Sequence, residues 1–141
     1  MLIAVAIGGK NIKFYVREIM DLIEINRAIY ERILLLQSLR GEMESKIVKK
    51  VNFSAAYDKE LAIVLVKLRN GVAFEIDGYK IQNPAVSIME KIAKGLCWKA
   101  GLNKDQSDAE YKALISKMDS IKIEINGLQS MKKNPEDLVG M

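Results

Sequence analysis

Apolar residues recur at helical spacing from Ile12 to Leu39, and this long stretch constrains the fold more than any other feature of the sequence. Residues three or four positions apart share one face of a helix, so the stretch predicts a long amphipathic helix. The main apolar row of this helix consists of Tyr15, Ile19, Leu22, Ile29, Ile33 and Leu36.

Further apolar residues lie beside the main row and widen the apolar surface beyond one face: Ile12, Val16, Ile23, Leu34 and Leu35. A helix this broadly apolar is expected to pack on two sides, within a bundle or between subunits. We therefore expect the main row, or a later helix over residues 108 to 128, to form the contact of a cyclic homo-oligomer. Asn26 falls on the main row, where it would fix register if buried or lie at the rim in water.

Two more helices are expected before residue 72. Arg40-Gly41 is expected to end the first helix, and a basic helix follows over residues 42 to 51. A third helix has Leu61, Val64 and Leu68 on one face, and Asn70-Gly71 supplies its C-terminal stop.

The apolar spacing changes after this stop, and Asp77-Gly78 stands between two short β-prone runs. An Asp-Gly pair in that setting predicts a two-residue hairpin turn, because both turn residues must adopt positive φ. Asn83 is then expected to cap a fourth helix that has Pro84 at its first position and ends at Gly101.

A fifth helix is expected to start at Ser107, because Ser107 and Glu110 have the spacing of a capping box. The sequence thus predicts an all-α fold, a bundle of about five helices with one small β-hairpin around residues 72–82. We expect a single helical domain over residues 1–131 and a mobile tail over 132–141, which contains Pro135 and little periodicity.

The absence of histidine and the single cysteine exclude several kinds of chemistry. A zinc site lacks its usual nitrogen and sulfur ligands, and Cys97 lacks a neighbouring histidine base, so it is expected to be a packed core thiol. Glu75, Asp77 and Lys80 resemble a metal-dependent nuclease cluster only faintly, because a turn would place them on an exposed tip. We therefore expect no enzyme, no metal and no cofactor.

The N-terminal residues are apolar for only seven positions before Gly8-Gly9, far fewer than the ~20 that a membrane helix needs. They are expected to form a short strand or a hydrophobic arm that docks on a neighbouring subunit. Gly9-Lys10 does not complete a phosphate-binding loop, because Asn11 stands where serine or threonine should be. The lone cysteine favours a reducing, cytoplasmic location.

Lys46, Lys49 and Lys50 form the densest basic cluster of a chain whose formal charge is +4. Lysines grouped on a helix can neutralise phosphates without reading bases, so this cluster is a candidate contact for duplex DNA. The alternative is a solvated helix face. Lys10, Lys13 and Arg17 form a second candidate DNA contact.

A run that comprises Gly78-Tyr79, Gln82-Asn83-Pro84, a helix and Gly101-Leu102 resembles the C-terminal part of one family of phage terminase small subunits. The segment Asn103–Ser107 departs from the family pattern, which has a Thr-Pro-Ser-Ser-Arg type sequence there. The resemblance implies a ring-forming helical adaptor in the host cytoplasm that binds viral DNA and recruits the large terminase subunit. A competing interpretation is a helical interaction protein, part of a larger assembly, with no nucleic-acid role.

Overall fold

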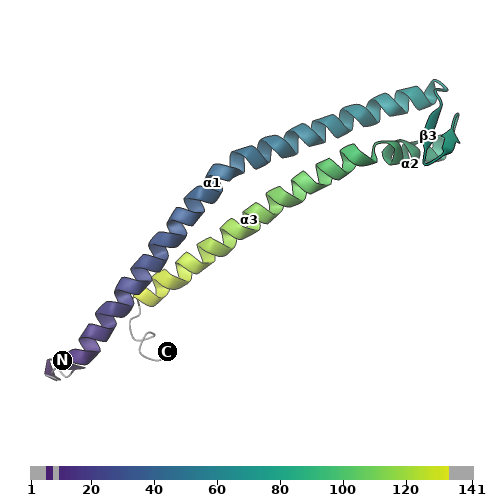
Figure 1. The fold of residues 1–141 in the computed structure, drawn as a ribbon. Coiled ribbons are helices and arrows are strands. Elements are labelled where there is room, and N and C mark those ends of the chain that lie inside the picture. Colours follow the sequence, from purple (N-terminus) through teal and green to yellow (C-terminus); the bar gives the residue numbers. More distant parts are fainter. Residues whose placement is uncertain (1–5, 8–9, 134–141) are drawn as a thin grey trace. The chain divides into compact units, whose positions relative to one another are not determined.

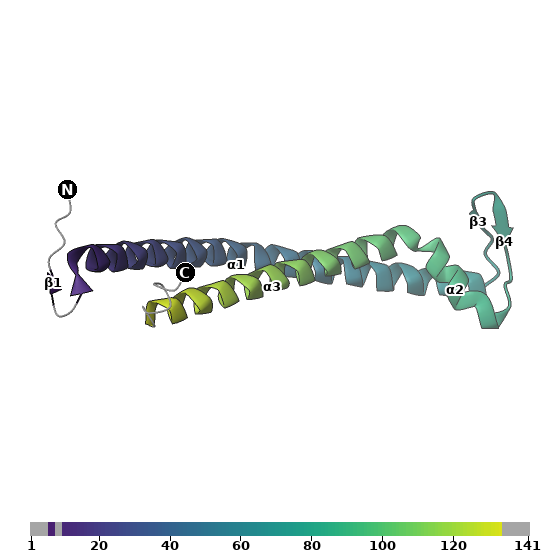
Figure 2. The ribbon, with the colours of Figure 1, turned by 90° about the horizontal axis from the view of Figure 1, so that it is seen from below.

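The structure, a computed structural model, describes residues 6–7 and 10–133, with side chains described at Lys13 and from Tyr15 onward. Three helices account for most of this part of the chain: α1 (Ile12–Arg69), α2 (Val86–Leu96) and α3 (Trp98–Lys133). Strands β1 (Ala6–Ile7) and β2 (Lys10–Asn11) pair antiparallel, as do β3 (Phe74–Ile76) and β4 (Tyr79–Ile81). Figures 1 and 2 show these elements from two directions.

The chain divides into two compact units. Unit 1 comprises residues 1–41 and 115–141, and unit 2 comprises residues 42–114. The predominantly helical fold with one small hairpin near residues 72–82 is confirmed, and the strand at Ala6–Ile7 fits one of the two expectations for the N-terminus. The expected tail begins with Lys132 and Lys133, which end α3, and otherwise lies outside the described residues.

The expected count of five helices is wrong, because three expected boundaries lie inside longer helices and one unexpected break occurs. α1 continues through Gly41, which does not adopt the positive φ of a C-terminal cap. A glycine inside a helix costs about 1 kcal/mol relative to alanine, a cost that the packing of a helix this long can offset. The helices expected over residues 12–39, 42–51 and 55–69 are therefore one element.

The expected boundary between the fourth and fifth helices is also wrong. Gly101 and Ser107 both lie within α3, and the helical break falls earlier, at Cys97. The Ser107 hydroxyl donates to the Lys104 carbonyl oxygen at 2.8 Å, the back-bonding geometry of a serine in a helix interior. Gly101 instead allows a close approach, since a Cβ there would lie 3.3 Å from the Tyr57 ring.

The C-terminus of α1 confirms the expected stop at Asn70-Gly71. Gly71 adopts φ +78, its N–H donates to the Leu68 carbonyl, and the Val72 N–H donates to the Lys67 carbonyl at 3.0 Å. This pair of bonds is a Schellman motif, which satisfies carbonyls that the helix end leaves free. The Gln82 side chain donates to the Gly71 carbonyl at 3.1 Å and so ties the β4 end of the hairpin to the end of α1.

The β3–β4 hairpin has the expected turn. Ile76 pairs with Tyr79, and Asp77 and Gly78 adopt φ +48 and +85, as a type I′ turn requires. The expected cap of the next helix is wrong: Asn83 adopts φ +49, and α2 begins at Val86 after Ala85, without a side-chain cap.

The core of unit 2 is formed by the last turns of α1, by α2 and by Cys97 directly after α2. Its buried residues are Val64, Leu68, Met89, Ala93 and Cys97. Phe74 and Ile81, which are paired across the hairpin, pack against this cluster. The hairpin and α2 therefore complete the apolar core around the end of α1, and Cys97 is the packed thiol that was expected.

In unit 1, the C-terminal part of α3 lies beside the N-terminal part of α1 (Figures 1 and 2). The buried residues are Ile25, Leu36 and Leu39 on α1 and Met118 and Ile121 on α3. Arg32 Nε bonds to Glu124 Oε2 at 2.7 Å at the edge of this contact. We call the α1 row that contributes to this contact the inner row, and it consists of Leu22, Ile25, Ile29, Arg32, Leu36 and Leu39.

Candidate interaction surfaces on helix α1

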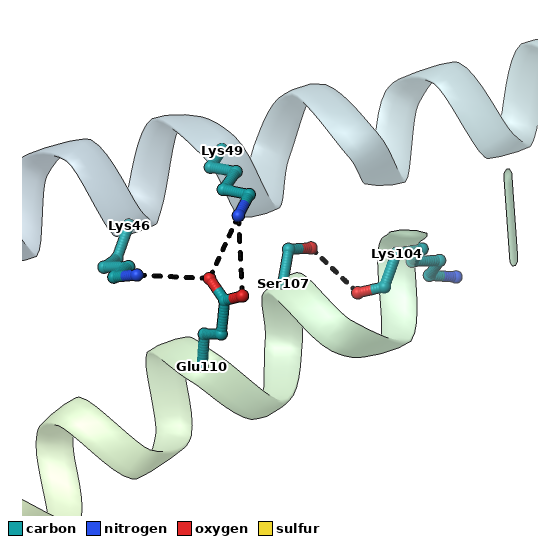
Figure 3. Close-up of polar contacts among 5 residues, drawn as sticks. All are labelled: Lys46, Lys49, Lys104, Ser107 and Glu110. Atoms are coloured by element: carbon teal, nitrogen blue, oxygen red, sulfur yellow. Dashed lines mark hydrogen bonds and ion pairs between the residues drawn. The ribbon is translucent and has the colours of Figure 1, made fainter. Parts of the chain in front are cut away.

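The lysine cluster expected to contact DNA faces carboxylates of α3 within unit 2, and Figure 3 shows Lys46 and Lys49 beside Glu110. Glu110 accepts from Lys46 at 3.2 Å and from Lys49 at 3.1 Å. Asp108 lies 3.2 Å from Lys50 Nζ and 2.9 Å from Lys112 Nζ. Four ammonium groups thus surround two carboxylates, and the cluster keeps an excess of positive charge.

Hydrogen bonds between partly exposed side chains shift the pKa values of Glu110, Asp108 and Lys112. Hydrogen bonds from Lys49 and Lys46 lower the pKa of Glu110, and hydrogen bonds from Lys112 and Lys50 lower the pKa of Asp108. The pKa of Lys112 is raised by its bond to Asp108. Such exposed pairs contribute modestly to stability, but several of them together fix which helix faces meet.

Lys50 has a second role, because its Nζ lies 4.6 Å from the centre of the Tyr111 ring. A cation over an aromatic face is attracted by the electron density of the ring. Lys50 therefore bridges Asp108 and Tyr111, both on α3.

The sequence did not identify Glu110 and Asp108 as partners of the lysines, because a capping box had been assigned to Glu110. One signal argues against a helix start at Ser107: Ser107, Tyr111, Leu114 and Met118 repeat at three and four residues without a break, as within a helix.

The second set of candidate DNA contacts lies at the N-terminal end of unit 1. Lys10 belongs to β2, Lys13 is exposed, and Arg17 is exposed beside an open cavity of about 320 Å³. Asp21, Glu24, Leu128 and Met131 also line this cavity. The surroundings of Arg17 thus mix both signs of charge with apolar side chains.

The main apolar row expected at a subunit contact divides between two faces of α1. Leu36 is buried, and Tyr15, Leu22 and Ile29 are half-buried, whereas Ile19 and Ile33 are exposed. Leu22, Ile29 and Leu36 belong to the inner row within the chain. Asn26 is exposed and does not lie in the inner row, so it does not fix the register of α1 against α3.

A second row of unit 1 remains uncovered, and we call it the outer stripe: Val16, Ile19, Ile23, Asn26, Tyr30 and Ile33. The side chains of Ile19, Ile23 and Tyr30 are 55%, 47% and 62% exposed. Its spacing is three, four, three, four and three residues, the repeat of a helix that packs along another helix. Each of the last four members of the stripe, from Ile23 to Ile33, is the next residue in the chain after a member of the inner row. Because a helix turns by about 100° per residue, the two rows lie about 100° apart around α1.

Three observations bear on metal binding and on the reactivity of Cys97 in the part of the chain that the structure describes. No group of three or more acidic or cysteine side chains is positioned there to hold a metal ion. Burial raises the pKa of the Cys97 thiol, with a smaller contribution from Glu60, so the nucleophilic thiolate is disfavoured. Glu75 and Lys80 pair across the hairpin, and Asp77 lies in its exposed turn.

Among the residues that the structure describes, no helical stretch combines the length and apolar character needed to cross a bilayer.

Comparisons with protein-family models, with curated proteins and with solved structures find no significant match to this chain. The resemblance to terminase small subunits therefore stays a hypothesis from the residues that carry it.

Proposed function

We propose that this protein is a non-enzymatic, self-assembling helical subunit, which joins further copies of itself through the outer stripe of α1. The observation that supports this function is the stripe itself. Large apolar side chains fill five of the six positions of this row at helix-packing spacing, with Asn26 at the sixth, whereas scattered single residues would need no explanation. Removing such surface from water gains roughly 25 cal/mol per Å², so a matching helix would be stabilised along the whole row.

Two lysine substitutions of exposed isoleucines test this function in the full chain. Ile23→Lys places a charge in the outer stripe, and Ile123→Lys places the same charge on α3 of the same unit, where Ile123 is 70% exposed. We expect light scattering to give wild type and Ile123→Lys the same multimeric mass and Ile23→Lys the mass of a single chain. Circular dichroism should show equal helix content in all three proteins. Equal masses for the three would contradict the proposal.

Duplex DNA binding is a second candidate, supported by the excess of positive charge around Asp108 and Glu110 and by the net charge of +4. In this proposal, Lys46, Lys49 and Lys50 exchange their carboxylate partners for phosphates. The DNA-packaging adaptor role, with a ring of subunits and a large terminase partner, rests on the resemblance and belongs to the same proposal.

DNA titrations at several salt concentrations separate a phosphate contact from an intrachain one. If the lysines contact DNA, replacing all three with alanine should flatten the slope of log affinity against log salt by about 0.9 per lost contact. Glu110→Gln should steepen the same slope, because it frees Lys46 and Lys49 from their carboxylate. Unchanged slopes in both variants would assign the cluster to intrachain pairing alone.

A further inference from the structure

We propose that the outer stripe of each α1 packs against the outer stripes of two further copies, parallel and in register, with three Asn26 side chains on one level. This inference rests on the proposed function and adds the identity, direction and number of the helices at the contact. It concerns only unit 1, where the described members of the stripe lie between Val16 and Ile33.

The spacing of the stripe specifies a helix as its occupant. Alternating steps of three and four residues keep side chains aligned with a neighbouring helix over several turns. The stripe covers two and a half heptads of α1 without interruption, from Val16 to Ile33. A groove for an extended strand or a small molecule would not require this repeat.

The occupant must be another α1, since α3 has no matching row to offer. Among the described residues of α3 in unit 1, Ile123 is the only large apolar side chain that is exposed. α1 in the same unit exposes the stripe and, next to it, Met20 and Leu34. A second copy of the chain can therefore cover the stripe with an equal stripe, but not with α3.

Asn26 favours a parallel, in-register arrangement. The stripe alternates steps of three and four positions, which together make one heptad of seven. Asn26 lies seven positions after Ile19 and seven before Ile33, so the three residues occupy the same heptad position. Parallel helices set equal heptad positions on one level, so each Asn26 amide meets another that can both donate and accept. Antiparallel helices would set Asn26 against Ile23 or Tyr30 and leave the amide without that partner.

The side chains around Asn26 favour three strands over two. Ile19 and Ile33 occupy one heptad position, and Val16 and Ile23 occupy the other, so both positions are mainly β-branched. Isoleucine at both positions shifts parallel coiled coils from two strands to higher states. The angle of about 100° between the outer stripe and the inner row suits this arrangement, because each α3 can then lie in a groove between two central helices.

Single cysteine variants of the full chain test direction and register. Ile19→Cys and Ile33→Cys are prepared separately, with Glu31→Cys as a control at an exposed position off the stripe. The native Cys97 is 1% exposed, so wild type should not link. Each stripe variant should form interchain disulfides under mild oxidation, because equal positions meet in a parallel, in-register contact. Glu31→Cys should stay single on a non-reducing gel.

The opposite pattern would overturn the inference. Positions 19 and 33 lie about 21 Å apart along a helix, far beyond the Cα separation of about 7 Å that a disulfide can bridge. In an antiparallel pair that sets Asn26 against Ile23 or Tyr30, neither position 19 nor position 33 faces its own copy, so both variants would keep a multimeric mass and yet form no disulfide. That result would contradict the parallel arrangement and leave self-assembly intact. A chain that stays single, or whose stripe binds lipid vesicles or another protein, would contradict self-assembly as well.

Discussion

At the residue scale, Gly41 and Gly71 were assigned the same role from sequence and have opposite roles in the structure. Gly41 stands inside α1 with open space at the position of a Cβ, whereas Gly71 adopts φ +78 with Asn83 Oδ1 3.2 Å from that position. Both were expected to end helices, and only Gly71 does. The stop at Asn70-Gly71 could be predicted because the apolar spacing changes after it, and no such change follows Gly41.

Alanine substitutions at these two glycines should therefore change stability in opposite directions. We expect Gly41→Ala to raise the free energy of unfolding by about 1 kcal/mol, because alanine has the higher helix propensity and meets no neighbour. Gly71→Ala should lower it, since an alanine there is strained at positive φ. Urea denaturation of the two variants beside wild type measures both shifts. Equal signs would contradict the helix boundaries described here.

The charges of the lysine cluster also predict a pH dependence at the residue scale. The folded-state pKa values of Glu110 and Asp108 are lowered by their lysine partners, so their contribution to stability is present above the unfolded pKa values. This contribution to stability is lost as the pH falls through the lowered pKa values of the folded state, in the range below about pH 4. Glu110→Gln should weaken this acid-side loss, measured by thermal melts from pH 7 to pH 2. An unchanged pH profile in this variant would contradict the role of Glu110.

At the scale of elements, the hairpin and α2 complete a core around the end of α1. The Asp77-Gly78 turn could be predicted from sequence because two positive φ angles restrict the residues that fit. The start of α2 could not, because Asn83 and Pro84 have the pattern of a helix start, while Asn83 takes positive φ and the helix begins at Val86. Local capping signals gave way there to the packing of Met89 and Ala93 against Val64 and Leu68.

The buried end of α1 should be far more sensitive to truncation than the exposed surface of α3. Leu68 is 1% exposed within the unit 2 core, and Leu102 is 47% exposed. We expect Leu68→Ala to lower the free energy of unfolding by about 2–5 kcal/mol, because it removes buried methyl groups and leaves a cavity. Leu102→Ala serves as the matched control and should change it by less than about 1 kcal/mol. Similar losses in both would place the core elsewhere.

At the scale of the whole molecule, the sequence predicted one main apolar row on the first helix, and the structure divides the members of this row between two faces. The row from Tyr15 to Leu36 combined members of both faces, because a step of three or four residues drifts around a helix with 3.6 residues per turn. The burial pattern separates them: Leu22, Ile29 and Leu36 lie in the inner row, and Ile19 and Ile33 lie in the outer stripe. The sequence of α1 alone cannot decide which of two apolar rows covers α3.

Sedimentation equilibrium of the wild-type chain over a range of concentrations tests self-assembly through the outer stripe most directly. A single chain has a mass of 15.9 kDa. We predict a mass of about three times this value at micromolar concentration, falling to that of one chain in Ile23→Lys and unchanged in Ile123→Lys. A wild-type protein with the mass of one chain at every concentration would contradict the account.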